Sequence, residues 1–142
     1  MRIEQTVAQL YRDYESRNLA GVLAALPDDF CFEWPFASRT ARYSGICQTK
    51  AQLLQQLTDL AANFQFNAYR ATSILVDRDR AAAQVQLDLT SVMTGERFSA
   101  TIAHFWTFRD GVPVHLVEYM DTALMTAQSP ARSVTAADAR AE

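Results

Sequence analysis

Apolar residues recur every three or four positions in two stretches of the first half of the chain, which is the spacing of an amphipathic helix. The first stretch predicts a helix over 3–17, and a shorter helix over 19–26 begins after Asn18 and stops at Pro27. The second stretch predicts a helix over 49–63, which opens on a Thr-x-x-Gln capping box. The apolar stripes of the two longer helices are Ile3, Val7, Leu10, Tyr11 and Tyr14, and Leu53, Leu57, Leu60, Ala61 and Phe64.

After residue 64 the apolar spacing changes to every second position, which is typical of a half-buried strand. Three turn sequences, Asp-Arg-Asp-Arg, Thr-Gly and Asp-Gly, divide this region into four long strands joined as hairpins. The four strands are expected at about 66–77, 81–93, 96–109 and 112–121. A short strand is expected at 30–34, a loop follows it over 35–47, and a short helix over 122–128 comes after the last strand.

These elements predict an α+β domain in which four consecutive antiparallel strands follow three helices. Strands this long twist and curl the sheet, so we expect a curved, mostly antiparallel sheet whose concave face the three helices cover. Residues 1–128 are expected to form this single domain. Residues 129–142 are small and polar without periodicity, which predicts a disordered tail.

Composition narrows the class of protein without indicating a reaction. The 142 residues are 49% apolar and 20% charged with a net charge of −3, as in an ordinary one-domain soluble protein. The basic residues are scattered, so we expect no nucleic-acid partner, and no apolar run reaches the roughly 20 residues of a membrane span. Cys31 and Cys47 lack metal-ligand spacing, so we expect free thiols, no metal, no cofactor and a cytoplasmic location. Lys50 is the only lysine beside many arginines, which hints at a bacterial source.

Two ionisable residues interrupt the apolar positions of the last two predicted strands. His104 is the exception among the alternate residues of 98–108, and Glu118 is the exception among those of 112–120. Since side chains alternate between faces, each strand directs one ionisable group into an apolar layer. A buried charge is costly unless it is paired. The two residues are therefore expected to pair, to line a wet pocket, or both.

Two interpretations of this pair stay open. His104 and Glu118 can form a buried ion pair that only stabilises the sheet, or they can contact a ligand as an acid/base site. The aromatic residues carry the same ambiguity, because residues that pack a helix and residues that line a pocket look alike in sequence. These aromatic residues are Tyr11, Tyr14, Trp34 and Trp106.

The order of the elements resembles that of a known fold. The chain is expected to contain three helices, a short strand and four long strands. A Phe-Arg-Asp-Gly turn precedes the last strand, which reads Val-Glu-Tyr-Met-Asp. This arrangement resembles nuclear transport factor 2, ketosteroid isomerase and the SnoaL-like polyketide cyclases. The resemblance covers residues 3–125 and implies a cone-shaped fold that encloses a hydrophobic pocket. Because this superfamily contains both enzymes and binding proteins, the fold alone does not assign an activity.

Two enzyme families of this superfamily match the sequence only in part. A ketosteroid isomerase would place its tyrosine at Tyr11 and its oxyanion-hole acid at His104. Its aspartate base would fall on Trp34, whose indole cannot take a proton from carbon. An enzyme that resembles limonene-epoxide hydrolase would use Glu118 and Asp88, but a glutamine stands where its arginine would be. Epoxide hydrolysis is kept as a weaker alternative that requires Asp88 to face Glu118.

The SnoaL-like cyclases resemble this chain most, because they place a histidine on the penultimate strand and an acid on the last one. The resemblance implies a cofactor-independent acid/base enzyme (a cyclase, isomerase or lyase) for a hydrophobic cyclic or polyketide-like carbonyl compound. His104 and Glu118 would be its catalytic pair and Tyr11 a hydrogen-bond donor. The residues expected to contact the ligand are Tyr14, Trp34, Phe36, Phe64, Trp106, Met120 and Asp88. A non-catalytic small-molecule binding or assembly module of the same fold is the alternative.

The outward positions of the predicted strands are also rich in apolar residues. A monomer rarely exposes an apolar patch of this extent. The resemblance implies association through the convex face, so a two-fold homodimer is expected. The residues assigned to this face are Val85, Leu87, Leu89, Ala103, Phe105, Val117 and Tyr119.

Overall fold

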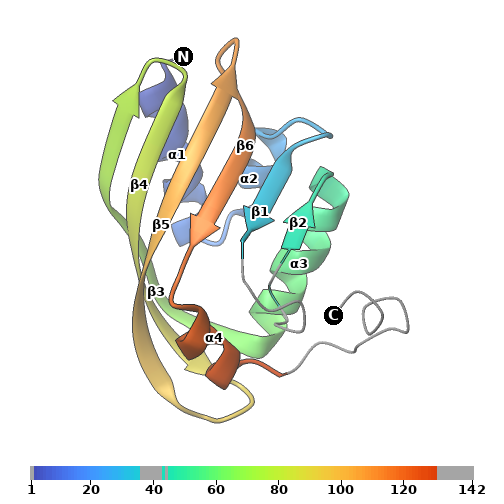
Figure 1. Ribbon diagram of the computed structural model, residues 1–142, viewed down its shortest axis with the longest axis vertical. Helices are drawn as coiled ribbons and strands as arrows, with labels where there is room; N and C mark the ends of the chain where they lie inside the picture. The colour runs from blue at the N-terminus through green and yellow to red at the C-terminus, as the bar shows by residue number, and fades with distance from the viewer. Residues whose placement is uncertain (1, 36–42, 44, 131–142) are drawn as a thin grey trace.

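The computed structural model describes residues 2–35, 43 and 45–130, and in them the predicted α+β fold is confirmed (Figure 1). The helices are α1 (Ile3–Glu15), α2 (Leu19–Ala24), α3 (Lys50–Asn63) and α4 (Thr122–Gln128). The strands are β1 (Cys31–Trp34), β2 (Gly45–Cys47), β3 (Phe64–Asp77), β4 (Arg80–Ser91), β5 (Arg97–Arg109) and β6 (Val112–Tyr119). None of the helices in these residues is long and apolar enough to span a membrane.

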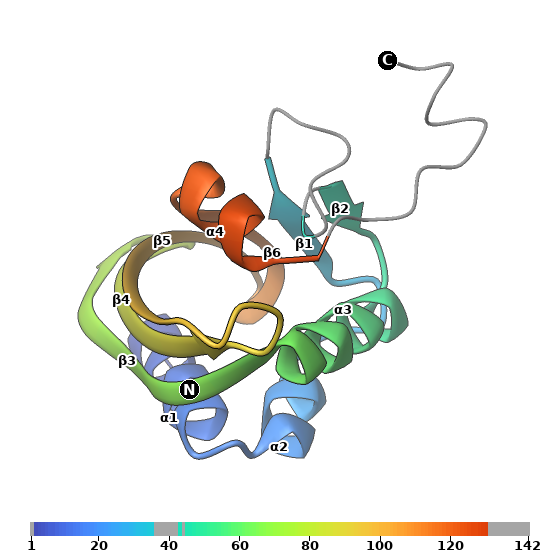
Figure 2. The same cartoon turned by 90° about the horizontal axis from the view of Figure 1, so that it is seen from below.

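The six strands form one curved sheet in the order β2-β1-β6-β5-β4-β3. β1 and β6 run parallel, and every other neighbouring pair is antiparallel. The twist of the long strands curls the sheet around an interior. Figures 1 and 2 show α1, α2 and α3 on the concave side of the sheet and α4 at one end of it. The apolar side chains of the helices and of the concave face meet in this interior.

Side-chain caps determine where three of the helices begin. The side-chain oxygen of Asn18 accepts a hydrogen bond from the backbone amide three residues later (3.1 Å), and Thr49 Oγ1 does the same (3.1 Å). Asp121 Oδ1 accepts the corresponding bond at the start of α4 (3.0 Å). Each cap satisfies an amide that has no partner inside its helix. The helix starts predicted from the sequence follow from these local bonds.

The turn between β5 and β6, together with a bulge beside it, sets the register of the two strands that carry the candidate pair. Asp110 and Gly111 both have a positive φ, of 50° and 78°. This backbone is that of a two-residue type I′ turn, whose twist matches that of the strands it joins. A register shift between Thr107 and Phe108 then moves the pairing by one residue. Without it the turn would place His104 opposite Val117, and with it His104 lies opposite Glu118.

β4 faces the opposite way to the one expected. Val85, Leu87 and Leu89 are buried inside the cone, whereas Gln84 and Gln86 are exposed on the outer face. The prediction that these three aliphatic residues belong to the outer face is therefore wrong. Burying such a side chain stabilises a fold by about 1.5–3 kcal/mol, whereas a buried amide needs a hydrogen-bond partner. The aliphatic residues therefore take the inside of the strand.

Two further differences lie at the edges of predicted segments. The segment 35–47, expected to be a loop, contains β2, whose three residues pair with β1 at the edge of the sheet. Ser129, expected in the tail, is buried and donates a hydrogen bond to the backbone oxygen of Met125 (2.6 Å). Residues 131–142, the rest of the predicted tail, lie outside the described residues.

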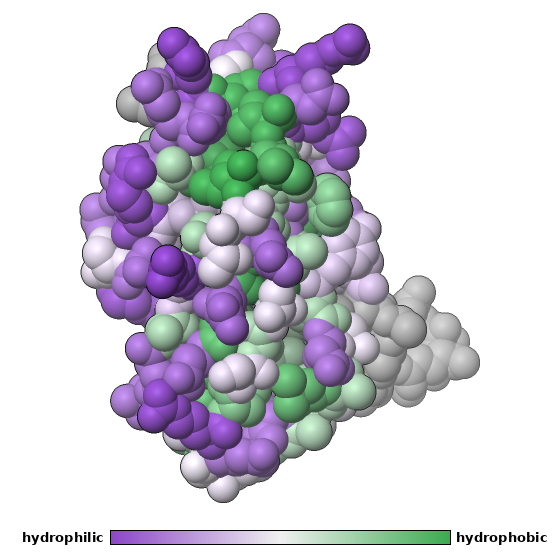
Figure 3. Space-filling model, turned by 90° about the vertical axis from the view of Figure 1, so that its left-hand side faces the viewer, coloured by the Kyte–Doolittle hydropathy of each residue, from purple (hydrophilic) through white to green (hydrophobic). Residues whose placement is uncertain are grey.

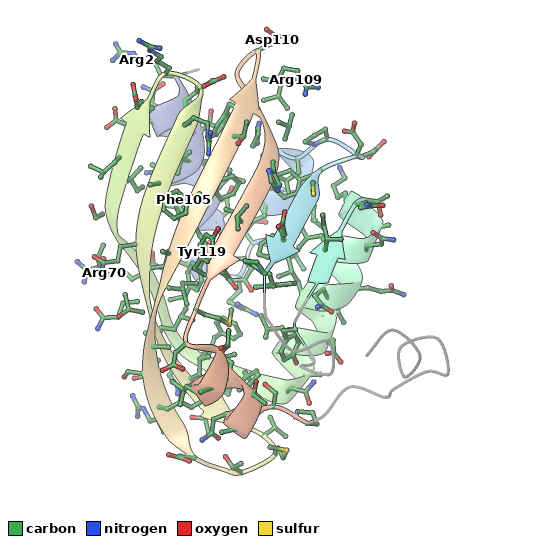
Figure 4. All side chains as sticks on the ribbon, viewed as in Figure 1. Arg2, Arg70, Phe105, Arg109, Asp110 and Tyr119 are labelled. Atoms are coloured by element: carbon green, nitrogen blue, oxygen red, sulfur yellow. The ribbon has the colours of Figure 1, made fainter. Side chains whose placement is uncertain are left out.

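Apolar side chains also appear on the outer surface. Figure 3 shows the side of the molecule that carries β3, where apolar residues gather toward one end. The exposed large apolar residues of that strand are Leu75 (69%) and Val76 (38%). On the neighbouring part of the outer face, Phe105 and Tyr119 project side by side from β5 and β6 (Figure 4). These side chains lie outside the core and are free to contact a partner.

Candidate functional site

His104 and Glu118 face each other inside the cone. They are direct partners in the register of β5 and β6, and His104 Nε2 lies 2.5 Å from Glu118 Oε1. Only 3% of His104 and 8% of Glu118 is exposed. The structure thus forms the pair that strand alternation indicates, and the chemical role of the pair stays a prediction.

Three aromatic side chains extend this pair into a chain of hydrogen bonds. On one side, the indole Nε1 of Trp34 donates to Glu118 Oε2. On the other side, the Tyr11 hydroxyl lies 2.6 Å from His104 Nδ1, and Trp106 Nε1 donates to the Tyr11 oxygen (2.9 Å). The hydrogen-bonded chain therefore connects β1, β6, β5 and α1, and all five of its residues are buried.

The partners in this chain determine where its protons lie. With Glu118 ionised, the imidazole hydrogen is on Nε2, because the carboxylate can only accept. Nδ1 of His104 then accepts the hydroxyl hydrogen of Tyr11, whose oxygen accepts the indole hydrogen of Trp106. A hydroxyl, a histidine and a carboxylate in this order form the arrangement that activates a hydroxyl in hydrolases. Here the hydroxyl is a phenol.

Burial keeps the tyrosines of this region neutral. It raises the pKa of Tyr11 far above its ordinary value, and the hydrogen bond from Trp106 offsets only part of this rise. Burial also raises the pKa of Tyr14 and of Tyr69. At neutral pH all three hydroxyls are therefore protonated hydrogen-bond donors.

A cavity of about 90 Å³ lies beside the hydrogen-bonded chain. Its walls come from all four helices and from every strand except β2, and Tyr11, His104 and Glu118 are part of the lining. The other lining side chains are aliphatic, aromatic or thioether groups. Because drug-sized pockets are usually larger than roughly 300 Å³, a ligand must be small or must displace flexible side chains. Met120 and Met125 in the lining can move in this way.

Several residues predicted to contact a ligand line this cavity, namely Tyr14, Trp34, Trp106 and Met120. The prediction is wrong for Phe64, which is buried in the core and packs against Tyr43 and Phe98. The reason is its place in the sheet, because Phe64 pairs with Ser91 at the end of the β3–β4 ladder, beyond the lining residues. Phe36 lies outside the described residues.

Asp88 lies on the outer face of β4 and not in the cavity. Its carboxylate accepts two hydrogen bonds from Arg97 (2.9 and 2.6 Å) and one from Asn67 (3.3 Å). The guanidinium of Arg97 lowers the pKa of Asp88. The ligand contact expected at Asp88 is therefore wrong, because the apolar side of β4 occupies the interior. Epoxide hydrolysis loses its second acid with it, since that hypothesis requires Asp88 to face Glu118.

Tyr69 lines the cavity although strand alternation does not place it there. Phe66 and Tyr69 both face inward, three positions apart, because β3 has a register shift between Phe66 and Ala68. A bulge of this kind inserts one extra residue and reverses the alternation beyond it. Counting every second residue from Phe66 therefore puts Tyr69 on the wrong face.

A second histidine–glutamate pair lies on the outer face of the sheet. His115 Nε2 and Glu33 Oε1 are 3.2 Å apart, and each side chain is 36% exposed. The residue types are those of the inner pair, but neither His115 nor Glu33 lines the cavity described above. It is therefore a natural control for effects that depend on burial.

The cysteines of the described residues form no second reactive site. Cys31 and Cys47 are free thiols, and burial raises the pKa of both. A raised pKa reduces the thiolate fraction and with it the reactivity. Within residues 2–35, 43 and 45–130, no three His, Cys, Asp or Glu side chains are grouped as metal ligands.

A family model described as a SnoaL-like domain matches residues 7–116 of this chain. The chain belongs to this family. The match begins in α1 and ends in β6, so it includes Tyr11, Trp34 and His104 and stops just before Glu118. The SnoaL-like domain thus contains most of the hydrogen-bonded chain.

Solved structures share the fold of this SnoaL-like domain over nearly all of its length. An NTF2-like protein of unknown function from Burkholderia pseudomallei has 22% identity and a TM-score of 0.81, with 89% of this chain and 96% of that chain covered. A candidate SnoaL-like polyketide cyclase from Mesorhizobium loti has 18% identity and a TM-score of 0.72, with 84% and 99% covered. TerC, co-crystallised with polyporic acid, has 19% identity and a TM-score of 0.75, with 89% and 96% covered. At these identities the likeness establishes the fold alone, and no curated protein matches the chain.

Proposed function

We propose that this SnoaL-like domain is a cofactor-independent acid/base enzyme that acts on a hydrophobic cyclic or polyketide-like carbonyl compound. The observation that carries the proposal is the hydrogen-bonded chain from Glu118 through His104 to Tyr11 at the wall of an apolar cavity. A buried imidazole with a carboxylate on one nitrogen and a hydroxyl on the other is arranged to move a proton. An ion pair that only stabilises the fold does not require the Tyr11 hydroxyl.

In this proposal Tyr11 adjoins the ligand and His104 acts through it. A proton leaves the carbon next to the ligand carbonyl and binds the Tyr11 oxygen, while the Tyr11 hydroxyl proton moves to His104 Nδ1. The electron pair of the broken C–H bond forms the enolate, and the Glu118 carboxylate stabilises the imidazolium. Because the raised pKa of Tyr11 disfavours a free phenolate, the two proton transfers occur together. The reverse transfer delivers the proton to another carbon or to a developing alkoxide, as isomerisation or ring closure requires.

The cavity favours a flat, hydrophobic ligand. Its walls are aromatic and aliphatic apart from the hydrogen-bonded groups, and aromatic walls bind rings through offset and edge contacts. TerC, which shares the fold, was co-crystallised with polyporic acid. That complex supports a small organic ligand for this chain as well.

Deuterium exchange tests the proposal without knowledge of the natural substrate. The protein is incubated in D2O with cyclic ketones such as 2-indanone and 2-tetralone, and proton NMR follows the loss of the signal from the carbon next to the carbonyl. We expect His104→Gln, Glu118→Gln and Tyr11→Phe each to slow the protein-catalysed exchange by about 10²–10⁴-fold. His115→Gln is the matched control, because it removes the histidine of the outer face and should leave the rate unchanged. Equal rates in wild type and His104→Gln would reject catalysis at this pair.

A non-catalytic binding module is the second candidate, and one observation favours it. Both ring nitrogens of His104 and both oxygens of Glu118 already have partners within the protein, as in a pair that only stabilises a fold. For a module, ketone binding persists in His104→Gln and neither wild type nor any variant catalyses exchange. Binding and exchange measured on the same samples therefore separate the two candidates.

A further inference from the structure

We infer that the hydroxyl of Tyr69 is the subsite that binds an oxygen atom of the ligand. The ligand oxygen would be a carbonyl, enol or quinone oxygen on a hydrophobic ring compound. This inference rests on the proposed ligand cavity but does not require that the site be catalytic. Its support comes from the backbone of β3, from the hydrogen bonds of the neighbouring tyrosine and from the charges around the cavity.

The backbone of β3 turns Tyr69 into the cavity. One register shift, between Phe66 and Ala68, precedes it, and a second shift follows it within the same strand. Between the shifts Tyr69 pairs with Leu87, which is buried and also lines the cavity. Bulges re-aim single side chains and are frequent beside active sites. The irregular backbone thus turns the Tyr69 side chain toward the cavity.

The ring of Tyr69 is held on three sides, but its hydroxyl is not engaged. Its ring centroid lies 4.6 Å from that of Tyr14, 6.3 Å from that of Phe66 and 6.4 Å from that of Tyr11. Among the described residues no side chain or backbone group forms a hydrogen bond with the Tyr69 hydroxyl. A donor in an apolar wall without an acceptor is the group that a ligand oxygen would satisfy.

Tyr11 is less suited to this task than its neighbour. Its hydroxyl hydrogen is directed to His104 Nδ1 (2.6 Å), and its oxygen accepts from Trp106 (2.9 Å). Donating to a ligand carbonyl would break the bond to the histidine. We therefore assign to Tyr69 the role expected for Tyr11, that of a hydrogen-bond donor to the ligand, because the Tyr69 hydroxyl has no hydrogen-bond partner among the described residues.

The charges around Tyr69 favour an oxygen acceptor. Burial raises the pKa of Tyr69 well above its ordinary value, and Tyr11, Tyr14 and the Glu118 carboxylate raise it further, so it stays a donor. The guanidinium of Arg17 lies over the ring of Tyr14, 5.2 Å from its centroid. Its positive charge lowers the pKa of Tyr69 but offsets the rise only in part.

A matched pair of ligands tests the inference. Acetophenone and α-methylstyrene have nearly the same shape, but only acetophenone carries an oxygen. Binding is followed through the methyl NMR signals of Met120 and Met125, which line the cavity, in wild type, Tyr69→Phe and Tyr119→Phe. Tyr119→Phe is the matched control, because it also removes one hydroxyl and keeps the ring but lies on the outer face of the sheet.

We expect wild type to bind acetophenone about fivefold more tightly than α-methylstyrene, the usual worth of one hydrogen bond. Tyr69→Phe should lose this preference while its affinity for α-methylstyrene stays the same, and Tyr119→Phe should keep it. A preference that survives in Tyr69→Phe overturns the inference. So does the absence of any preference, or of any binding, in wild type.

Thermal unfolding adds a measurement that needs no ligand. Removing an unengaged hydroxyl leaves the ring packing intact, so Tyr69→Phe should melt at or above the wild-type temperature. A clear fall in the melting temperature would show that the hydroxyl has a partner in the protein, and would overturn the inference. Neither measurement depends on turnover. A failed exchange assay together with an acetophenone preference would reject the enzyme and keep the subsite.

Discussion

Two histidine–glutamate pairs in this molecule differ in burial rather than in chemistry. His104 and Glu118 are 2.5 Å apart with 4% and 11% of their side chains exposed, whereas the outer pair, His115 and Glu33, is 3.2 Å apart with 36% of each exposed. Water competes with the outer pair and screens it, but it reaches the inner pair hardly at all. The same two residue types should therefore contribute differently to folding.

Double-mutant cycles on the free energy of unfolding should separate the two pairs. In the inner pair, His104→Gln or Glu118→Gln alone should destabilise the protein by about 3 kcal/mol, because the remaining group stays buried without its partner. The coupling energy of that pair should be about 2 kcal/mol, and that of His115 with Glu33 should stay below about 1 kcal/mol. Urea unfolding followed by circular dichroism measures both cycles. Equal coupling energies would mean that burial does not strengthen the inner pair.

One buried tyrosine, Tyr11, and two partly buried ones, Tyr14 and Tyr69, predict a loss of stability in alkaline solution. Burial raises the pKa of Tyr11, Tyr14 and Tyr69 above the value of about 10 that they have in the unfolded chain. The folded protein then keeps protons that the unfolded chain releases. The stability they contribute is complete below about pH 10 and falls as the pH rises, by up to about 1.4 kcal/mol per pH unit for each tyrosine.

Urea unfolding of wild type and Tyr69→Phe between about pH 9 and pH 11 measures this effect. The free energy of unfolding should fall less steeply with pH in Tyr69→Phe, because only two of the three tyrosine hydroxyls then remain to titrate. Comparing the two proteins removes the contributions of groups that they share, such as the cysteine thiols. Identical slopes would contradict the raised pKa of Tyr69.

Strand alternation predicts that His104 meets Glu118, but it does not predict their further partners. A two-residue turn joins the two strands, but their register also depends on the bulge between Thr107 and Phe108, without which His104 would face Val117. Trp34 and Tyr11 come from β1 and α1, and their positions depend on how these elements pack against the sheet. In the sequence Trp34 counts against an isomerase and is expected to contact the ligand, whereas in the structure its indole also donates to Glu118. Contacts between distant segments of the chain leave no local pattern.

Among the helices and strands, those with a long unbroken period were predicted well. α3 ends at Asn63, as the apolar stripe of that helix indicates. β5 ends at Arg109, as the Asp-Gly turn after that strand indicates. β2 was missed because three residues are too few to show a period. The bulges of β3 were missed because neither glycine nor proline marks them. The face of the sheet from which Tyr69 projects depends on how β3 packs against its neighbouring strand, so the local sequence does not predict it.

Lys50 connects two helices and gives a prediction at the scale of elements. It is the first residue of α3, and its Nζ donates to the backbone oxygens of Leu23 (3.0 Å) and Leu26 (3.1 Å) at the end of α2. The Leu23 oxygen also accepts a hydrogen bond from the backbone amide of Leu26 (3.2 Å), and the second lone pair of such a carbonyl can still accept from Lys50. A cation is favourable at this end of the helix dipole. Lys50→Met keeps the aliphatic stem and should lower the free energy of unfolding by about 1.5–3 kcal/mol.

Asp28→Asn is the matched control for this change. The Asp28 carboxylate lies 3.6 Å from Lys50 Nζ, but its side chain is fully exposed. An exposed ion pair of this kind contributes little, so the control should change the free energy of unfolding by less than about 0.5 kcal/mol. Urea unfolding measures both variants. Equal losses would mean that Lys50 acts through the carboxylate and not through the helix end.

For the molecule as a whole, the outer face of the sheet carries one largely apolar row across all six strands. In strand register the row runs through Leu75, Ala82, Phe105, Val117, Glu33 and Ile46. Tyr119 lies beside it, and its ring meets that of Phe105 edge to face at 5.8 Å (Figure 4). Phe105 is 44% exposed and Tyr119 is 51% exposed. Surfaces of this kind usually pack against a partner.

We propose a two-fold dimer in which this row packs against the same row of a second copy. Phe105→Glu places two like charges against each other across the axis, so we expect it to be a monomer in size-exclusion chromatography with light scattering, where wild type is a dimer. Val92→Glu is the control, because Val92 is 65% exposed but lies beyond the end of β4. The cavity faces the other side of the sheet, so the Phe105→Glu monomer should still bind acetophenone. A monomeric wild type, or a dimer that Val92→Glu also dissociates, would exclude the outer face as the interface.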